Sequence, residues 1–215
     1  MKKITRILII AASLAMITSY FTPMWMIDLE APQYPEGLGM QIWINKITGD
    51  LNTINGLNHY IGMKKIEPDS IKELSIMPYV LGFLIAAGVF TGIAGKKKLL
   101  AVWVVIFLIA GAAGGVDFYM WEYDYGHNLD PTAAIIVPGM SYQPPLIGST
   151  QLLNFVATSM PDIGGIIIMA AGLFGVLALI YESWFGRKKN VKLNEKNTAE
   201  KSDQVKENTN EYEMA

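Results

Sequence analysis

Four long apolar blocks decide what this chain can fold into. The first, "ILIIAASLAMITSYFTPMWMI", covers residues 7–27, and the others cover residues 76–93, 99–116 and 163–181. A helix of about 20 apolar residues crosses the hydrocarbon core of a bilayer. The chain is only 17% charged, against about 25% for soluble domains. We therefore predict an all-α integral membrane protein, with four transmembrane helices forming a membrane domain over residues 1–186.

Two of these blocks leave an alternative open. The first follows the basic start "MKKITR", as a secretory signal peptide would. Its apolar run is longer than a usual signal segment and no A-x-A-like site follows it, so an uncleaved anchor is the favoured interpretation. The fourth helix could begin earlier, near Ser149, because "STQLLNFVATSM" is amphipathic, and Pro161 would then mark a kink or a boundary.

Positive charges predict the orientation of the chain in the membrane. Lys and Arg cluster in residues 2–6, 96–98 and 187–192, next to the ends of the apolar blocks. The loop 28–75 contains four lysines, and the loop 117–162 contains neither Lys nor Arg. Because cytoplasmic loops carry the excess of Lys and Arg, we expect both termini in the cytoplasm. We then expect a bacterial inner (cytoplasmic) membrane protein with two sizeable extracytoplasmic loops, 28–75 and 117–162.

The remaining composition excludes several classes of protein. Residues 187–215 are rich in Lys, Glu and Asn, and we expect a disordered, charged cytoplasmic tail there. A net charge of −2 gives no basic field for nucleic acid, so we expect no nucleic-acid partner. The absence of cysteine excludes disulfides, zinc-thiolate sites and haem attached through cysteine.

Both loops carry weak local signals. "GLGMQIWINKITGDL" alternates apolar and polar residues around Gly39 to Ile47, which predicts a short strand or a hairpin arm. "EPDSIKELS" predicts a short helix that starts near Asp69 or Ser70. The aromatic residues of the second loop are typical of a belt at the membrane surface: Tyr119, Trp121, Tyr123 and Tyr125.

The most specific chemical signal is a set of histidines and methionines in the two loops. His59 and Met63 are spaced i, i+4, so on a helical turn they would share one face. The second loop adds His127 and Met140. Imidazole and thioether ligands suit a soft ion such as Cu(I), so these four residues are the candidate metal ligands and copper the candidate cofactor. Two alternatives stay open, namely histidines that hydrogen-bond to the backbone or cap turns, and a contact with a quinone or substrate.

Enzymatic signals are weaker. The carboxylates Asp117, Glu122, Asp124 and Asp130 are expected to be solvated or to cap turns. The sequence contains no Walker loop, G-x-S-x-G or H-E-x-x-H motif, and no nucleophile with an evident base. We therefore predict that the protein is not an enzyme and name no catalytic residue.

Two segments carry a family resemblance: "EAPQYPEGLGMQIWINKITGDLNTINGLNHYIGM" and "YGHNLDPTAAIIVPGMSYQPPLIG". On them the chain resembles small bacterial membrane proteins encoded with nitrous-oxide reductase and its copper-maturation factors, which include a copper chaperone and an ABC-type exporter. The resemblance covers both loops and their flanking apolar blocks, and it implies a part in delivering copper or electrons to a periplasmic copper enzyme.

The resulting functional expectation is an inner-membrane accessory protein that supports a periplasmic copper enzyme of the nitrous-oxide-reductase type. It would act in denitrification through copper handling or partner assembly on its outer loops. The expected partners are the lipid bilayer and a copper chaperone, an ABC exporter or the copper enzyme itself. Two alternatives are a quinol-linked membrane electron-transfer component and a purely structural subunit of a membrane complex.

Overall fold

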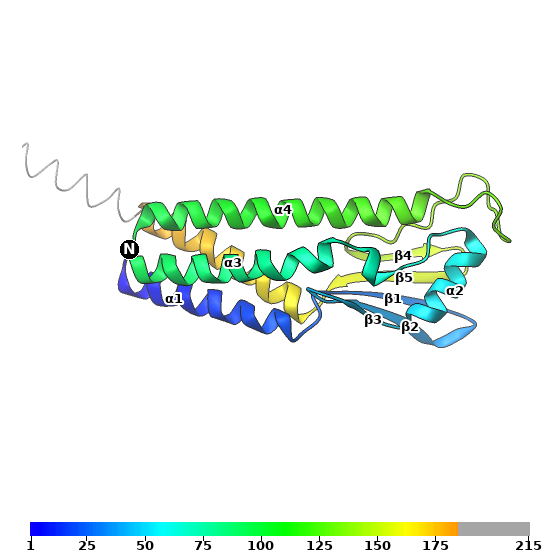
Figure 1. Ribbon diagram of the computed structural model, residues 1–215, viewed down its shortest axis with the longest axis horizontal. Coiled ribbons are helices and arrows are strands. Elements are labelled where there is room, and N and C mark those ends of the chain that lie inside the picture. The colour runs from blue at the N-terminus through cyan, green and yellow to red at the C-terminus, as the bar shows by residue number, and fades with distance from the viewer. Residues whose placement is uncertain (185–215) are drawn as a thin grey trace, which may run out of the picture.

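A computed structural model of the protein describes residues 1–184, so the predicted tail at 187–215 lies outside the described residues. The described part contains four helices long and apolar enough to cross a membrane, which confirms the prediction of a membrane protein. These helices gather in one half of an elongated molecule, and a β-sheet with a short helix fills the other half (Figure 1). The membrane helices are Lys3–Tyr20, Glu73–Ala94, Lys97–His127 and Ile163–Trp184.

The all-α fold class is wrong, because the two predicted loops build a five-stranded antiparallel sheet. Its strand order is β3-β2-β1-β5-β4. The alternating pattern around Gly39 to Ile47 does form strands, since Met40 pairs with Gly49 across β2 and β3. The strands are β1 (Trp25–Ala31), β2 (Tyr34–Ile42), β3 (Ile47–Gly49), β4 (Gly148–Leu152) and β5 (Phe155–Pro161).

The first membrane helix is shorter than the apolar block 7–27 predicted. It comprises α1 (Lys3–Ala15) and a 3₁₀ turn, η1 (Met16–Tyr20). Pro23 follows, and β1 begins at Trp25. Proline cannot donate the hydrogen bond that would continue a helix. Of the apolar residues after it, Trp25 and Ile27 of β1 pack in the core of the sheet.

The segment "STQLLNFVATSM" is a hairpin of β4 and β5 rather than an early start of the fourth helix. Leu152, Ala157 and Ser159 are buried, and the burial in β5 alternates with a period of two. Pro161 ends β5, and the last helix starts two residues later, at Ile163. Pro161 is therefore a boundary rather than a kink.

The sheet is joined to the membrane helices at the point where β1 and β5 meet. Trp25 pairs with Pro161 at this end of the central ladder. The Asp162 amide donates to the Met24 carbonyl at 3.0 Å, and the Ser19 hydroxyl donates to the Gly164 carbonyl at 2.9 Å. The first and last membrane helices are thus tied to adjacent strands.

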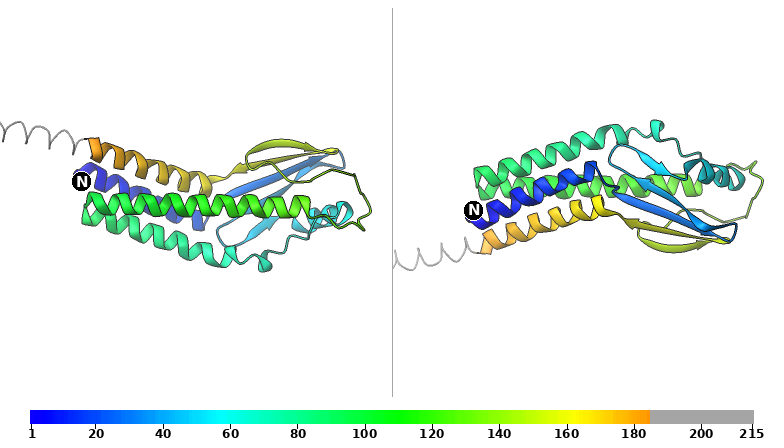
Figure 2. Two further views of the ribbon diagram at one scale, coloured as in Figure 1. Left: turned by 90° about the horizontal axis from the view of Figure 1, so that it is seen from above. Right: turned by 90° about the horizontal axis from the view of Figure 1, so that it is seen from below.

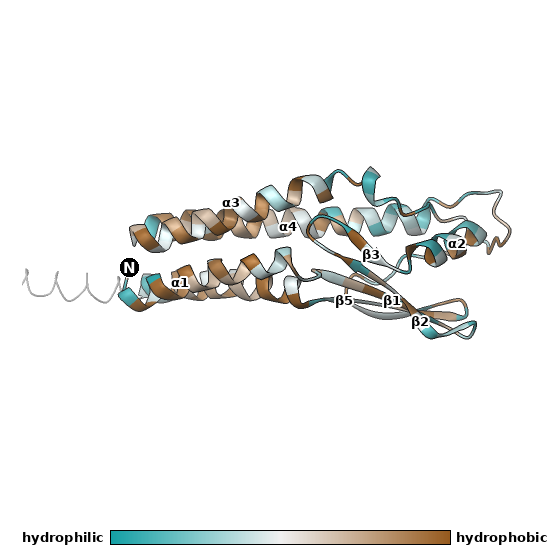
Figure 3. Ribbon diagram, turned by 60° about the horizontal axis from the view of Figure 1, so that its bottom comes forward, coloured by the Kyte–Doolittle hydropathy of each residue, from teal (hydrophilic) through white to brown (hydrophobic). Residues whose placement is uncertain are grey.

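The third apolar block extends well beyond the predicted span 99–116. Helix α4 (Lys97–His127) has 31 residues and is about 46 Å long at about 1.5 Å per residue, whereas the hydrocarbon core is about 30 Å thick. The part of α4 after Val116 runs beside the sheet, as both views in Figure 2 show. This part is also more hydrophilic than the rest of the helix (Figure 3).

The second apolar block, predicted at 76–93, is α3 (Glu73–Ala94), and a Gly-Lys turn leads from it into α4. The short helix expected from Asp69 or Ser70 is a single 3₁₀ turn, η2 (Pro68–Ser70), just before α3. Another helix, α2 (Leu51–Ile61), lies over the sheet. We call the five strands, α2 and the part of α4 after Val116 the sheet unit. Its buried core is formed by Ile27, Leu38, Met40, Ile47, Ile54 and Ile66.

Small residues bring the membrane helices close together. A Cβ added to Gly88 of α3 would lie 2.1 Å from the Ser13 hydroxyl of α1, and one on Gly92 would lie 2.4 Å from an Ile10 side-chain carbon. The string "AAGVFTGIAG" therefore packs against α1, as its small residues predict. In contrast, Gly111 and Gly115 of α4 have no atoms within 4 Å of an added Cβ.

Candidate functional site

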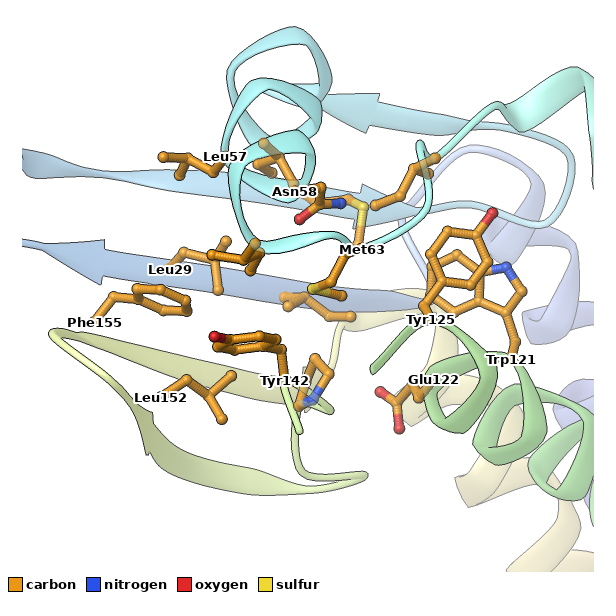
Figure 4. Close-up of a pocket in the computed structure, with 16 residues that line it drawn as sticks. Leu29, Leu57, Asn58, Met63, Trp121, Glu122, Tyr125, Tyr142, Leu152 and Phe155 are labelled. Carbon is orange, nitrogen blue, oxygen red and sulfur yellow. The ribbon is translucent and has the colours of Figure 1, made fainter. Parts of the chain in front are cut away.

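A small cavity lies in the sheet unit, between α2, α4 and the sheet (Figure 4). Its volume is about 60 Å³, and most of its lining is aliphatic or aromatic. The exceptions are two thioethers, a carboxylate, an amide and the phenol groups of two tyrosines, from residues far apart in the sequence. These side chains belong to Met40, Asn58, Met63, Glu122, Tyr125 and Tyr142.

The end of α2 places Met63 at this cavity. The helix stops at Ile61, and Gly62 follows with a left-handed φ of 78°. A side chain at Gly62 would also meet the Asp130 carbonyl oxygen at 2.8 Å, so only glycine fits this turn. The Met63 amide donates to the Asn58 carbonyl at 2.9 Å, which turns the chain back toward the cavity.

Helix α4 places Glu122 at the cavity from the opposite side. Phe118, Glu122 and Tyr125 are spaced i, i+4 and i+7, so they share the face that packs on the sheet. Phe118 packs edge-on against Trp25 with ring centroids 5.3 Å apart. The carboxylate of Glu122 points away from α4, toward the side where Tyr142 lies (Figure 4).

The surroundings of Glu122 contradict the prediction of a solvated or capping carboxylate. Its side chain is 1% exposed, and neither of its oxygens has a hydrogen-bond partner among residues 1–184. Burial raises the pKa of this carboxyl from 4.5 to about 8. The neighbouring Asp124 behaves as predicted, since it is partly exposed and forms an ion pair with Lys64 at 2.6 Å.

The second long loop covers the cavity with Tyr142. Its amide donates to the Gly126 carbonyl of α4 at 2.9 Å, and a Cβ on Gly126 would lie 2.4 Å from the Gln143 amide nitrogen. The ring of Tyr142 is 2% exposed, and its hydroxyl has no partner within the described part of the chain. The lining of the cavity therefore includes three side chains with a buried polar atom that has no partner within residues 1–184: Trp121, Glu122 and Tyr142.

The candidate ligands His59 and Met63 do not share a helical face, because α2 ends before Met63. His59 is exposed near the end of α2 and lies close to Asp130. Hydrogen bonds from Thr132 lower the pKa of Asp130, and the nearby His59 contributes to the same shift. Of these two candidate ligands, only Met63 lines the cavity.

His127 and Met140 have other surroundings. The ring of His127 stacks on Tyr123 with centroids 3.9 Å apart, and its Nδ1 lies 3.1 Å from the Tyr123 carbonyl oxygen. This histidine thus contacts the backbone of α4, which is the kind of contact that one of the alternatives described. Met140 is half-buried in the loop after α4, where its amide donates to the Val137 carbonyl at 3.1 Å.

The expected aromatic belt is divided between two faces of α4. Trp121 and Tyr125 pack against the core of the sheet unit, with ring centroids 4.4 Å apart. Tyr119 and Tyr123 are about half exposed, at 47% and 48%. Only these two have the exposure that a place at the membrane surface requires.

No family model matches this chain, and neither does any curated protein. Residues 1–184 contain no group of three or more His, Asp or Glu side chains that could hold a metal ion. Thioether sulfur can also bind soft metal ions, and the side chains of Met40 and Met63 line the cavity.

Proposed function

We propose that this protein is a non-enzymatic accessory protein of the bacterial inner membrane that supports a periplasmic copper enzyme of the nitrous-oxide-reductase type. Its sheet unit would handle copper or assemble partners such as a copper chaperone, an ABC exporter or the enzyme. The observation that carries this proposal is the sheet unit itself, a packed structure that joins the membrane helices directly and holds a cavity to which two methionines contribute. The sequence resemblance supports the same function.

The distribution of charge supports a periplasmic sheet unit. Lys2, Lys3 and Arg6 lie at the start of the first membrane helix, and Lys96 to Lys98 lie where the turn after α3 leads into α4. Both groups lie at the end of the molecule far from the sheet (Figure 1). Arg6 also donates to the Gly92 and Ile93 carbonyls, which joins the two groups. With positive charge on the cytoplasmic side, the sheet unit faces the periplasm.

An exposed apolar segment supports a role in partner binding. Ile135 and Ile136, in the loop after α4, are 47% and 61% exposed. This loop lies at the end of the molecule opposite the N-terminus (Figure 1), away from the bilayer around the helices. Exposed apolar patches of this kind mark protein contacts, so a periplasmic protein is the occupant we propose.

The test is purification of the full chain from its native membranes in mild detergent, with identification of the bound proteins and metals. We expect a copper-maturation factor or the copper enzyme in the wild-type sample. The variant Ile135→Ser/Ile136→Ser should lose it, while Val156→Ser, which changes an exposed apolar residue of β5, should keep it. A haem spectrum in the sample would instead support the electron-transfer alternative.

A deletion strain completes the test. Loss of the protein should lower the activity of the copper enzyme, and added copper or a plasmid copy should restore it. Full copper-enzyme activity without the protein would contradict the proposed function. Restoration by the plasmid but never by copper would favour a purely structural subunit.

A further inference from the structure

We propose that strand β4 binds an extended segment of a partner protein, which adds to the sheet as a further strand. The strand order β3-β2-β1-β5-β4 places β4 at one edge of the sheet. The inference deepens the proposed function, because it rests on partner assembly and names the surface and the mode of binding.

The backbone of β4 has unused hydrogen-bonding groups along its outer edge. Leu152 pairs with Phe155 across a two-residue turn, and the residues that flank such a turn bond to each other. Bonding then alternates, so Ser149 and Gln151 point their amide and carbonyl groups away from β5. The Ser149 hydroxyl lies 2.8 Å from that of its partner Thr158, which fits a non-hydrogen-bonded pair, where side chains are closest. Within the described part of the chain, no backbone group outside the hairpin bonds to β4.

The opposite edge of the sheet is protected against further pairing, whereas β4 is not. Strand β3 has only three residues, and the charged Lys46 and Asp50 flank it directly. Short edge strands and edge charges are the usual devices that prevent another strand from adding. Strand β4 has five residues in an unbroken register and contains no charged residue, proline or bulge. It is therefore the edge to which another strand can add.

The surroundings of β4 are uncharged and partly apolar. Residues 131–161 contain no Asp, Glu, Lys, Arg or His. Leu146 and Ile147 lead into β4 and are 39% and 60% exposed. Exposed apolar side chains beside an unpaired edge favour a contact with another protein. The buried Leu152 and the exposed Gln151 represent the two faces of β4, so we expect an uncharged segment that alternates apolar and polar residues.

A second copy of the chain does not fit this edge. The strands run roughly along the long axis of the molecule, as the membrane helices do (Figures 1 and 2). An antiparallel pair of β4 strands would therefore place two helix bundles at opposite ends, which one bilayer cannot contain. A parallel pair with two-fold symmetry would place each residue opposite itself, whereas parallel pairing sets an inward-bonding residue opposite an outward-bonding one.

The end of the chain is not the occupant either. The last membrane helix ends far from the sheet, at the end of the bundle where the N-terminus lies (Figure 1). In the proposed orientation this end is cytoplasmic and the sheet unit is periplasmic. The segment that adds to β4 therefore comes from a different protein with a periplasmic part.

The test is amide hydrogen exchange on the full chain in mild detergent, purified with its partner from native membranes and compared with the chain produced alone. In the chain alone, the amides of Ser149 and Gln151 should exchange about tenfold faster or more than those of Thr150 and Leu152, which bond to β5. In the complex all four should be slow. A photo-crosslinking amino acid in place of Gln151 should react with one extended segment of the partner, whereas one in place of Gln41, an exposed residue of β2, should not.

Two variants of Gln151 separate the backbone from the side chain. Gln151→Pro removes an outward amide without breaking a bond to β5, so it should keep a Tm close to that of the wild type and weaken partner capture about tenfold or more. Gln151→Ala keeps the amide and should capture the partner as the wild type does. Thr150→Pro removes an amide bonded to β5 and should lower the Tm, which checks the assignment of the two sides of β4.

Three results would overturn the proposal. These are a complex in which the amides of Ser149 and Gln151 exchange as fast as in the chain alone, full capture by folded Gln151→Pro, or crosslinks from position 151 to a second copy of this chain. If Gln151→Pro does not fold, the exchange and crosslinking results decide by themselves.

The strand-addition site and the proposed function can fail separately. If folded Gln151→Pro still captures a copper-maturation factor, β4 is not the binding site and the proposed function stands. If Gln151→Pro loses its partner but the deletion strain has full copper-enzyme activity, the edge binds a protein of another system and the proposed function is wrong.

Discussion

Glu122 is the residue at which the apolar packing of the sheet unit is interrupted. Its helical neighbours on the same face, Phe118 and Tyr125, pack on the sheet core, so its own side chain is drawn into the same environment. The protein lowers the cost of burying this group by keeping it protonated, and burial is the reason that its pKa rises to about 8.

This residue makes the stability of the metal-free protein depend on pH. The folded chain holds the Glu122 proton up to about pH 8, whereas the unfolded chain releases it near pH 4.5. The contribution of the Glu122 proton to the free energy of unfolding is therefore fully present below about pH 4.5. It is lost as the pH rises toward 8 and above, by up to about 1.4 kcal/mol per pH unit. Glu122→Gln should remove this slope and give a higher Tm than the wild type at pH 8.5.

The measurement is thermal unfolding in detergent between pH 5 and 9, followed by near-UV circular dichroism. Glu36→Gln, which changes an exposed carboxylate on β2, is the matched control and should keep the wild-type slope. A wild-type Tm that does not fall between pH 5 and 8.5 would contradict the argument.

Sequence patterns could single out Met63 among the residues of the cavity, but not Glu122 or Met40. Met63 lies next to a histidine in a polar loop, which draws attention to its sulfur. Met40 belongs to an alternating strand pattern, where an apolar residue is expected in a core. The only signal for Glu122 is a single carboxylate at i+4 between two aromatic residues, and its burial depends on a sheet formed by distant segments.

At the scale of the elements, the helices followed from the sequence and the sheet did not. A block such as 76–93 is long enough to specify a membrane helix by itself. Strands β1 and β5 pair across about 130 residues, for example Ile27 with Ser159, and no local pattern records such a partner. The block 7–27 also combined a helix and the start of a strand, because both are apolar and only Pro23 separates them.

The β4–β5 hairpin contains a strained residue that can be improved. Leu153, the first of its two turn residues, has a φ of 54°, a region that favours glycine. Leu153→Gly should stabilise the protein by about 1 kcal/mol because it removes the steric cost of the Leu Cβ. Leu153→Ala removes the same exposed apolar surface but keeps a Cβ, so thermal unfolding should show no comparable gain. Equal Tm values for Leu153→Gly and Leu153→Ala would show that the backbone at Leu153 is not strained.

The junction between the sheet and the last helix depends on a close backbone approach. A Cβ on Gly165 would lie 2.2 Å from the Met24 carbonyl oxygen. Gly165→Ala should therefore destabilise the protein by about 1–3 kcal/mol, as overpacking does. Gly115→Ala, where an added Cβ meets no atom within 4 Å, is the control and should be close to neutral in the same unfolding assay. Equal effects of the two alanines would show that the junction tolerates movement.

At the scale of the whole molecule, the proposed orientation predicts that the sheet unit is accessible from the periplasm and the connection between α3 and α4 from the cytoplasm. The chain contains no cysteine, so single cysteines can be introduced without background. Asn52→Cys and Gln151→Cys place exposed thiols on the sheet unit, one in each predicted loop, and Lys97→Cys places one at the start of α4, beside its turn with α3. A membrane-impermeant maleimide should label the first two in intact spheroplasts and the third only after permeabilisation. Labelling of Lys97→Cys in intact spheroplasts would reverse the proposed orientation.

The pairing of β1 with β5 limits how the molecule can open. The first and last membrane helices leave the bilayer directly into these two central strands, and six residue pairs from Trp25↔Pro161 to Glu30↔Val156 connect them. Spreading these two helices apart would break a ladder in the middle of the sheet rather than at its edge. Any lateral gate or hinge must therefore lie on the side of α3, which follows a loop of the sheet unit, whereas α4 continues into the sheet unit as one helix.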